Sequence, residues 1–202
     1  MPKIVDPERR RAEVVEAVFR LVDRGGIESA SLRNVATEAG LNVGSVRHYF
    51  TSHDDLLLAA AEEMTRRVEN RIAARAPALS RAYAAHDLVA VGRGLTAVFA
   101  ELLPLDATRR RECAVWLAFV ERSRVQPELR AAADEVHILV RDATRRMLAG
   151  AGVPRPADAA ECLLAGVDGL TLTGLQLPER YPPARLRRLL RQLVALALTG
   201  AD

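Results

Sequence analysis

The 202-residue sequence has few cysteines and no long uncharged apolar run, and each scarcity argues against a class of protein. Its two cysteines, Cys113 and Cys162, lie far apart and form no CxxC pair, which fits a reducing compartment and disfavours a metal knuckle. The longest nearly uncharged stretch, residues 162 to 177, is shorter than the roughly 20 residues of a membrane helix and contains Asp168. We therefore expect no membrane span.

The start of the chain shows no signal peptide, and the overall charge gives little information about a partner. The first six residues are followed by charged residues, where a signal peptide has an apolar core, so we expect a cytoplasmic protein. The net charge is only +3, from 29 basic and 26 acidic residues, which does not by itself indicate a nucleic-acid partner. All basic residues except Lys3 are arginine, which suits phosphate and guanine contacts, but a G+C-rich genome is a simpler explanation of this bias.

Apolar residues recur at steps of three and four along almost the whole chain, which predicts an all-α fold. Prolines and glycines divide the pattern into about nine helices, with no internal repeat. Their expected ranges are about residues 7–24, 31–39, 43–49, 52–75, 87–103, 108–125, 128–148, 157–177 and 184–198. We interpret residues 1–52 as a three-helix DNA-binding head and residues 53–202 as a helical-bundle body for ligand binding and dimerisation.

Residues 31 to 50 have the spacing of a helix-turn-helix, in which two short helices are joined by a tight turn. Ser31 is a suitable N-cap for the first helix, Gly40 a suitable end for it, and Asn42 a suitable N-cap for the second. In this motif the second helix lies in the major groove and the first crosses the DNA backbone. The segment therefore predicts DNA binding.

After this turn the sequence resembles the TetR family of transcriptional regulators. The resemblance rests on the pattern Leu41-Asn42-x-Gly44-Ser45-Val46-x-x-Tyr49-Phe50, followed by Ser52, Leu56 and Leu57. It covers about residues 10 to 60 and includes the turn, the aromatic end of the recognition helix and the start of the next helix. The resemblance implies that Ser31 and Tyr49 contact phosphates, that the start of the fourth helix touches the backbone, and that the residues facing the bases are Val43, Ser45 and Arg47.

The full candidate DNA-binding surface comprises Ser31, Arg33, Asn42, Val43, Gly44, Ser45, Arg47, His48, Tyr49 and His53. Two of these residues depart from the family pattern. Arg47 stands where tyrosine is usual, and it could read a guanine through two hydrogen bonds or pair with a phosphate. His53 stands where lysine is usual, so its phosphate contact would be weaker or depend on pH.

Other interpretations of the head remain open. Residues 31 to 50 could form an ordinary helical hairpin with Tyr49 as a core aromatic, and Phe50 is expected in the core either way. The basic residues at the start, Lys3 and Arg9 to Arg11, either lie along DNA or begin a solvated helix. Residues 1–52 hold eight basic and seven acidic residues, so DNA affinity would depend on local geometry and on dimerisation.

The last two expected helices differ from the others because they are rich in apolar and small residues. Residues 162 to 177 contain Gly166, Gly169 and Gly174 and a single charge, which predicts burial nearly all round. The final helix has an apolar stripe of leucines and small residues. We expect these two helices to form a homodimer interface, with packing inside one chain as the alternative. The TetR resemblance implies the same interface.

A mixed set of apolar and polar residues between the head and the last helix resembles the lining of a small-molecule site. The candidate ligand-binding residues are Trp116, Phe119, His137, Asp168, Thr171 and Gln176. Trp116 and Phe119 are better suited to a plain core than to a pocket wall, whereas Asp168 needs a partner, which could be an arginine, a helix end or a cationic ligand. The region from Trp116 to Glu128 and the glycine-rich helix also resemble the C-terminal domain of betaine-responsive TetR relatives, without indicating a ligand.

No enzymatic motif accompanies these features. The histidines His48, His53, His86 and His137 lack HExxH spacing, and no GxSxG, P-loop or GxGxxG pattern is found, so we expect no catalytic residue, cofactor or metal. The expected function is a ligand-responsive transcriptional regulator, in the first place a repressor, that binds a palindromic DNA operator as a dimer and is released by a small-molecule effector. The alternative is a helical protein-interaction module that does not bind DNA.

Overall fold

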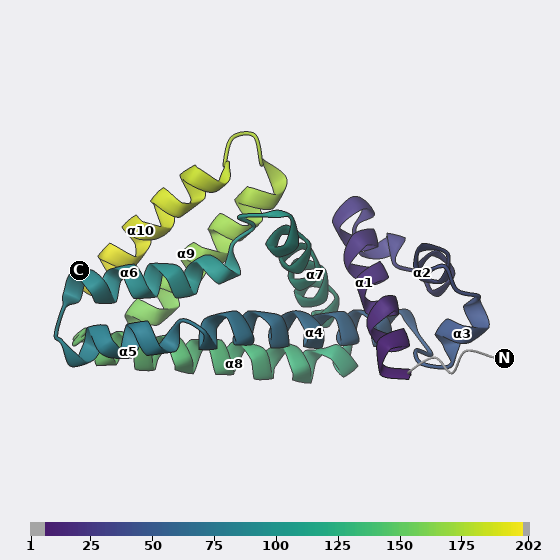
Figure 1. Cartoon of the computed structure of the whole chain (residues 1–202), viewed down its shortest axis with the longest axis horizontal. Coiled ribbons are helices and arrows are strands. Elements are labelled where there is room, and N and C mark those ends of the chain that lie inside the picture. The colour runs from purple at the N-terminus through teal and green to yellow at the C-terminus, as the bar shows by residue number, and fades with distance from the viewer. Residues whose placement is uncertain (1–6, 200–202) are drawn as a thin grey trace. The chain divides into compact units, whose positions relative to one another are not determined.

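The computed structural model describes residues 7–199, which form ten α-helices and two short 3-10 helices and contain no strand (Figure 1). In chain order they are α1 Pro7–Gly25, η1 Ile27–Ser29, α2 Leu32–Ala39, α3 Val43–Arg47, α4 His53–Ala73, α5 Ala76–Ala84, α6 Leu88–Phe99, η2 Ala100–Leu102, α7 Ala107–Ser123, α8 Pro127–Gly150, α9 Pro156–Gln176 and α10 Pro183–Thr199. The all-α prediction is confirmed. Lys3, one of the residues expected to lie along DNA, is outside the described residues.

The structure has one α-helix more than the sequence predicts, and this helix is α5. The sequence pattern treats Pro77 only as the end of the preceding helix. In the structure α4 ends at Ala73, and Pro77 occupies the first turn of the next helix. Proline is well tolerated there because the first amide groups of a helix have no intrahelical acceptor. The same residue therefore separates two helices and begins the second.

The chain divides into two compact units. Unit 1 comprises the residues up to Arg66 together with Ala114–Arg130, and unit 2 comprises Arg67–Cys113 together with the residues from Ala131 onwards. The helices α4, α7 and α8 therefore each contribute to both units. The domain boundary expected after residue 52 stays a prediction.

Unit 1 has a core formed by one face of α1 against the helix-turn-helix segment. Val14, Val18 and Val22, spaced by four residues, are buried as the sequence pattern predicts, and Phe19 joins them. From the helix-turn-helix segment, the core includes Val35, Ala36, Val46 and Phe50. Phe50 is thus a core residue, as expected.

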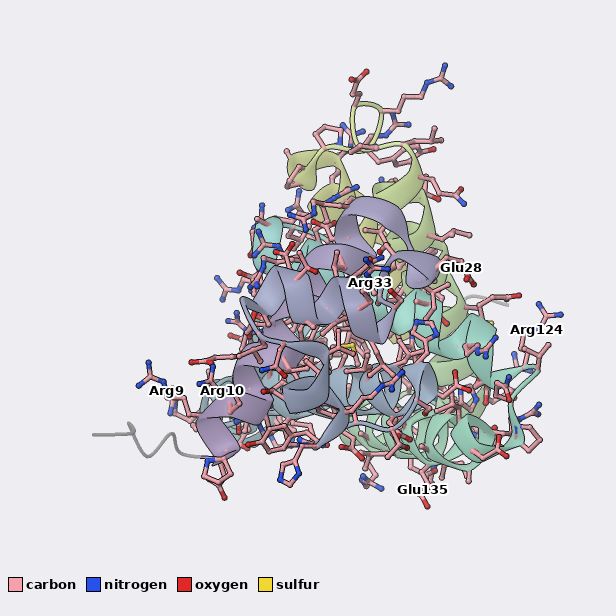
Figure 2. The ribbon with its side chains drawn as sticks, turned by 90° about the vertical axis from the view of Figure 1, so that its right-hand side faces the viewer. Arg9, Arg10, Glu28, Arg33, Arg124 and Glu135 are labelled. Atoms are coloured by element: carbon pink, nitrogen blue, oxygen red, sulfur yellow. The ribbon has the colours of Figure 1, made fainter. Side chains whose placement is uncertain are left out.

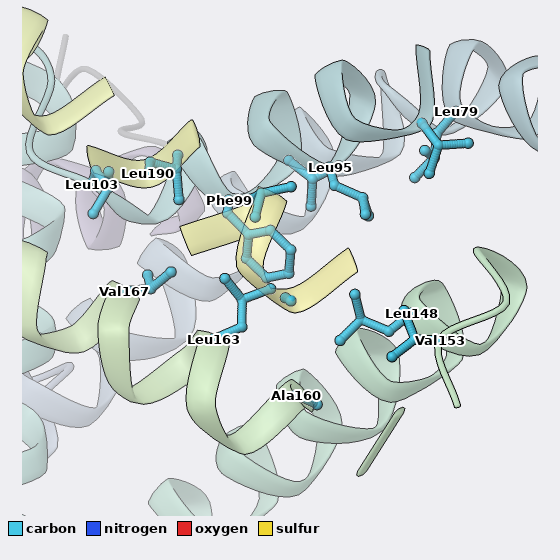
Figure 3. Packing of buried hydrophobic residues seen from close by; sticks show 14 of the residues in the cluster. Leu79, Leu95, Phe99, Leu103, Leu148, Val153, Ala160, Leu163, Val167 and Leu190 are labelled. Carbon is cyan, nitrogen blue, oxygen red and sulfur yellow. The ribbon is translucent and has the colours of Figure 1, made fainter. Parts of the chain in front are cut away.

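Unit 2 has a larger apolar core, drawn from α6, α9 and α10 with contributions from α5 and α8 (Figure 3). Leu95, Phe99, Leu163 and Leu190 are almost completely buried at its centre. The helices α9 and α10 lie side by side, because a Cβ atom added at Gly166 would come within 2.8 Å of Leu193 Cδ1. Glycine at this position therefore permits the close approach of the two helices.

The face of α9 opposite this core is open. The sequence predicts burial nearly all round α9, but Ala165, Gly169 and Leu172 are exposed in the single chain. This expectation was wrong for one chain because α9 packs against its own core on one side only. The exposed side consists mainly of small or apolar residues.

Unit 2 also contains a buried ion cluster that joins α4, η2 and α7. Glu101 and Glu112 are 1% and 2% exposed, respectively. Glu101 accepts hydrogen bonds of 2.9 Å from Nε of Arg71, of Arg75 and of Arg109. Arg71 also donates to Glu112, with Nη2 to Oε2 at 2.5 Å. Each buried carboxylate thus has cationic hydrogen-bond donors, which burial of a charge requires.

No single helix among residues 7–199 is long and apolar enough to cross a membrane. The helix pair Leu88–Leu102 and Ala107–Ser123 reaches the necessary length and composition together, but it is bent by 67°. Buried core helices often have the same composition.

Candidate nucleic-acid interface

The turn between α2 and α3 is held by side-chain caps and by one glycine. The Ser31 hydroxyl accepts a hydrogen bond of 3.2 Å from the Asn34 amide at the start of α2. Gly40 ends α2 in the left-handed conformation, with φ of 67°, which glycine adopts without a steric penalty. The Asn42 side chain then caps α3 by accepting from the Ser45 amide at 2.7 Å. The expected caps and helix end are thus present.

Because α3 has only five residues, its N-cap is expected to matter for the stability of the head. Replacing Asn42 with alanine should lower the free energy of unfolding by about 1 kcal/mol, because the Ser45 amide loses its acceptor. Asn42→Ser is the control, since serine caps a helix about as well as asparagine. Urea unfolding followed by circular dichroism measures both variants. Equal losses for alanine and serine would contradict a capping role.

The start of α4 is also capped. The Ser52 hydroxyl accepts from the Asp55 amide at 3.0 Å, and the Asp55 carboxylate accepts from the Thr51 and Ser52 amides at 2.9 and 3.1 Å. The hydrogen bonds from the Thr51 side chain and amide hold the pKa of Asp55 below its ordinary value, against the effect of desolvation. This reciprocal arrangement is a capping box, and it fixes the chain between α3 and α4.

The structure brings most of the ten candidate DNA-binding residues together on α2, the turn and α3. Five are exposed: Arg33, Asn42, Gly44, Arg47 and His48. The other five are half-buried: Ser31, Val43, Ser45, Tyr49 and His53. The segment from residue 39 to residue 53 contains no aspartate or glutamate, so no negative side chain from it opposes a phosphate backbone.

Two aromatic candidates differ in their freedom to contact DNA. The Tyr49 ring packs edge-on against His48, with centroids 5.1 Å apart, and its hydroxyl has no hydrogen-bond partner among residues 7–199. His53 Nε2 instead lies 3.0 Å from the Ile27 carbonyl oxygen. The backbone of η1 therefore engages this ring nitrogen, and a phosphate contact through His53 stays a prediction.

Sequence reasoning missed a charge cluster beside the motif. Glu38 of α2 accepts a hydrogen bond of 2.6 Å from Arg20 Nε and another from Arg24 Nη2, both on α1. These hydrogen bonds, with that from Arg20 the larger effect, hold the pKa of Glu38 below its ordinary value. The only feature of the sequence that could have indicated this cluster is the pair of arginines, Arg20 and Arg24, four residues apart on α1. Glu38 thus joins α2 to α1 through two arginines.

The six candidate ligand-binding residues fall in both units. Trp116 and Phe119 pack together on α7 in unit 1, with ring centroids 6.1 Å apart, and Phe119 is buried. In unit 2, Thr171 is buried and its hydroxyl donates to the Leu102 carbonyl oxygen at 3.0 Å. His137, Asp168 and Gln176 are not buried in the single chain.

One of these polar residues, Asp168, has a shifted pKa. Desolvation raises the pKa of the Asp168 carboxyl above its ordinary value, and the charge of His137 on α8 opposes this rise. A groove of about 810 Å³ also lies in unit 2, but none of the six residues lines it; it runs between the start of α9 and the end of α10, beside Asp158, Leu193 and Leu196. The predicted ligand contacts therefore stay predictions.

Comparison with known proteins identifies both parts of the chain. Residues 14–60 match the family model described as bacterial regulatory proteins, tetR family. Residues 91–199 match the model described as BetI-type transcriptional repressor, C-terminal. The chain belongs to the TetR family. The match at the N-terminal end covers the capped helix-turn-helix segment, and it confirms the resemblance proposed from the sequence.

Full-length relatives agree with these matches. The HTH-type transcriptional regulator PksA of Bacillus subtilis is 33% identical, with 96% of this chain and 92% of PksA covered. The HTH-type transcriptional regulator BetI of Paraburkholderia xenovorans is 29% identical over the whole of both chains. This TetR-family chain is therefore a DNA-binding transcriptional regulator, and the alternative of a helical module without DNA binding is not supported.

Solved structures show the same fold. A transcriptional regulator from Rhodococcus sp. Rha1 is 32% identical and superposes with a TM-score of 0.82, with 98% of each chain covered. A regulator from Saccharomonospora viridis in complex with choline is 21% identical and has a TM-score of 0.75, with 93% of this chain and 96% of that chain covered. At this lower identity the second likeness concerns the fold alone.

Proposed function

We propose that this TetR-family regulator is a dimeric repressor that binds a palindromic DNA operator and is released by a small-molecule effector. The observation that carries this proposal is the surface of α2 and α3, where Arg33 and Arg47 are exposed and residues 39 to 53 include no acidic side chain. A dimer would present two recognition helices one DNA turn apart, roughly 34 Å. The contacts we propose are those expected from the ten candidate residues, with α3 in the major groove.

The proposed dimer interface is formed by the last two helices, α9 and α10. Its support is an exposed face of small and apolar residues that includes Leu172 on α9 and Leu196 on α10, which are 41% and 59% exposed. Charge also suits pairing of two copies, because α9 has three acidic and no basic residues whereas α10 has four arginines and no acidic residue. Two copies of such a helix pair can form a four-helix interface with opposite charges facing each other.

The proposed effector site in unit 2 involves four of the six candidate residues, His137 on α8 and Asp168, Thr171 and Gln176 on α9, while effector contacts of Trp116 and Phe119 on α7 in unit 1 stay predictions. Asp168 is exposed and forms no ion pair among the described residues, so its carboxylate is available to a ligand that bears positive charge. Ligand binding would shift α4, which contributes to both units, and so spoil the spacing of the two recognition helices. A coupling of about 1 to 3 kcal/mol would lower operator affinity about 5-fold to 150-fold.

The proposed role as a repressor also determines the proposed domain boundaries, the cellular location and the absence of catalysis. We propose that residues 1–52 form the DNA-binding domain and residues 53–202 the ligand-binding and dimerisation domain. The protein would act by binding alone, without catalysis, in the cytoplasm where its operator lies. No cofactor or metal is needed for such a mechanism.

Selection of bound sequences from a random double-stranded DNA pool, repeated at two salt concentrations, tests the operator claim. We expect an enriched palindrome whose half-sites lie about 10 base pairs apart, with binding that weakens steeply as salt rises. Absence of enrichment in the apo protein, and again with effector candidates present, would overturn operator binding.

Gel shift with the selected operator then tests the effector claim. Choline, the compound bound in the Saccharomonospora viridis structure, is a suitable first candidate. Release of the wild-type protein but not of Asp168→Asn by the same compound would support the proposed site. Unchanged binding across a panel of cationic, neutral and anionic compounds would contradict release by a small molecule.

A further inference from the structure

Most arginines of unit 1 form ion pairs within the chain, each with an acidic side chain on the same or a neighbouring helix. The acidic partner reduces the net positive charge that such an arginine presents to a phosphate or a base. The pairs are Arg9 and Arg10 with Glu13, Arg11 with Glu62, Arg20 and Arg24 with Glu38, Arg66 with Glu63, Arg122 with Asp54 and Arg124 with Glu121. Arg130 also has an interaction within the chain.

Arg33 and Arg47 are the exceptions in unit 1. Both are exposed, and neither forms an ion pair or hydrogen bond with its side chain among residues 7–199. They lie on the two helices of the helix-turn-helix, Arg33 on α2 and Arg47 on α3. Figure 2 shows Arg33 on α2, well apart from Arg9 and Arg10 at the start of α1. The fold thus leaves free the two cations that the motif would bring to DNA.

The position of Arg47 on α3 directs its side chain toward the part of the helix that reads bases. Val46 is completely buried, whereas Gly44 and Arg47 are exposed and Val43 is half-buried between the two faces. Arg47 lies four residues after Val43 and three after Gly44, so the three share one face. Long side chains on a helix point back toward its N-terminus, which places the guanidinium over the turn that contains Gly44.

Gly44 leaves this space open. A Cβ atom added there would meet only the capping oxygen of Asn42, at 3.2 Å, and nothing on the outer side. The guanidinium of Arg47 can therefore lie across the N-terminal turn of α3 without a competing side chain. In a helix-turn-helix, that turn is the part that contacts base edges in the major groove.

We propose that Arg47 determines operator specificity by reading one guanine in each half-site, whereas Arg33 binds a phosphate. This inference rests on the proposed binding of a palindromic operator. The planar guanidinium offers two parallel donors, which match the O6 and N7 acceptors of guanine. Adenine presents a donor at N6 in place of O6, so it would repel one of the two N–H groups. Arg33 lies on the helix that crosses the backbone, where contacts position the protein without reading sequence.

Random-pool selection with the wild type, Arg47→Ala and Arg33→Ala tests the proposal, and both exposed sites allow the variants to fold. Arg47→Ala should lose preference at one G·C pair in each half-site while the rest of the palindrome persists. At that pair, the wild type should prefer G·C to A·T by about 5-fold to 150-fold per half-site. Arg33→Ala should keep the wild-type sequence preference and bind all sequences more weakly, with a salt slope shallower by about 1 for each phosphate that is no longer bound.

Replacement of that guanine by 7-deazaguanine supplies a second readout, because this base lacks the N7 acceptor. The modified operator should bind wild-type protein several-fold more weakly and should make no difference to Arg47→Ala. Uniform weakening by Arg47→Ala, with the sequence preference intact, would overturn the proposal and make Arg47 a phosphate contact. If the wild type itself enriched no palindrome, the proposed operator binding would fail instead, and the guanine contact with it.

Discussion

Replacing Glu101 with alanine is expected to lower the free energy of unfolding by about 3 kcal/mol, because removing one partner from a buried ion cluster leaves charges without compensation. Glu101 is 1% exposed and binds Arg71, Arg75 and Arg109 at once. Removing it leaves Arg75 without its only cluster partner, while Arg71 keeps Glu112 and Arg109 keeps Asp106. Urea unfolding of the purified protein at pH 7 measures the change.

Glu121→Ala is the matched control for this variant. Glu121 forms an ion pair with Arg124 Nη1 at 3.3 Å, and both side chains are largely exposed. Exposed pairs of this kind stabilise a protein by about 0.2 to 1 kcal/mol, so the control should change the unfolding free energy little. Similar losses for Glu101→Ala and Glu121→Ala would show that the cluster contributes no more than a surface pair.

The same cluster predicts acid sensitivity. Burial raises the pKa of the Glu101 carboxyl, but the hydrogen bonds from Arg75 and Arg109 outweigh it and hold the pKa below its ordinary value of 4.5. A carboxyl whose pKa is lower in the folded state contributes stability above its unfolded pKa and loses it as the pH falls through the folded value. Wild-type stability should therefore fall more steeply below about pH 4.5 than that of Glu101→Gln. Parallel unfolding free energies of the two proteins from pH 7 to pH 3 would contradict this origin.

The helices and the motif could be predicted from the sequence because their determinants are local. Helix ends follow from glycines and prolines, and the caps Ser31 and Asn42 act within three residues. The error at α5 has the same origin, because a proline ends one helix and begins another with equal ease. Local patterns thus sufficed for the all-α fold and for the position of the helix-turn-helix segment, while the DNA contacts of its residues stay predictions.

The buried ion cluster could not be predicted, because its partners are distant in sequence. Arg71 and Glu112 are 41 residues apart, and Arg75 and Glu101 are 26 apart. The only local indication of the cluster is that Glu101 lies within the apolar run from Ala97 to Leu105, and this position does not identify the partner of the glutamate. Thr171 could not be assigned a partner from the sequence for the same reason, since its hydroxyl donates a hydrogen bond to the carbonyl oxygen of Leu102, 69 residues away. A polar residue in an apolar helix indicates a missing partner without distinguishing a ligand from the chain itself.

Placing aspartates on the exposed face of α9 and α10, in the variant Leu172→Asp with Leu196→Asp, is expected to give monomers and to lower operator affinity by about 100-fold or more. Both leucines are exposed in the single chain, so the change should leave the core of each chain intact. In the proposed dimer they are covered, and unpaired carboxylates would then lose water without gaining a partner. Once a dimer is bound to one half-site, its second subunit binds the other half-site intramolecularly. This raises the operator affinity by about 10²- to 10⁴-fold, and a monomer loses the gain.

Leu88→Asp provides the control, because Leu88 is 63% exposed at the start of α6, where an acidic residue suits a helix N-terminus. Light scattering and fluorescence anisotropy on the selected operator should show a dimer with wild-type affinity for this variant. If the double variant were also dimeric, the interface would have to lie elsewhere, although DNA binding through α3 would stand. If it were monomeric but bound the palindrome as tightly as the wild type, cooperation between half-sites would not depend on contact between subunits. The variants therefore separate the interface from the recognition surface, which a single loss of DNA binding cannot do.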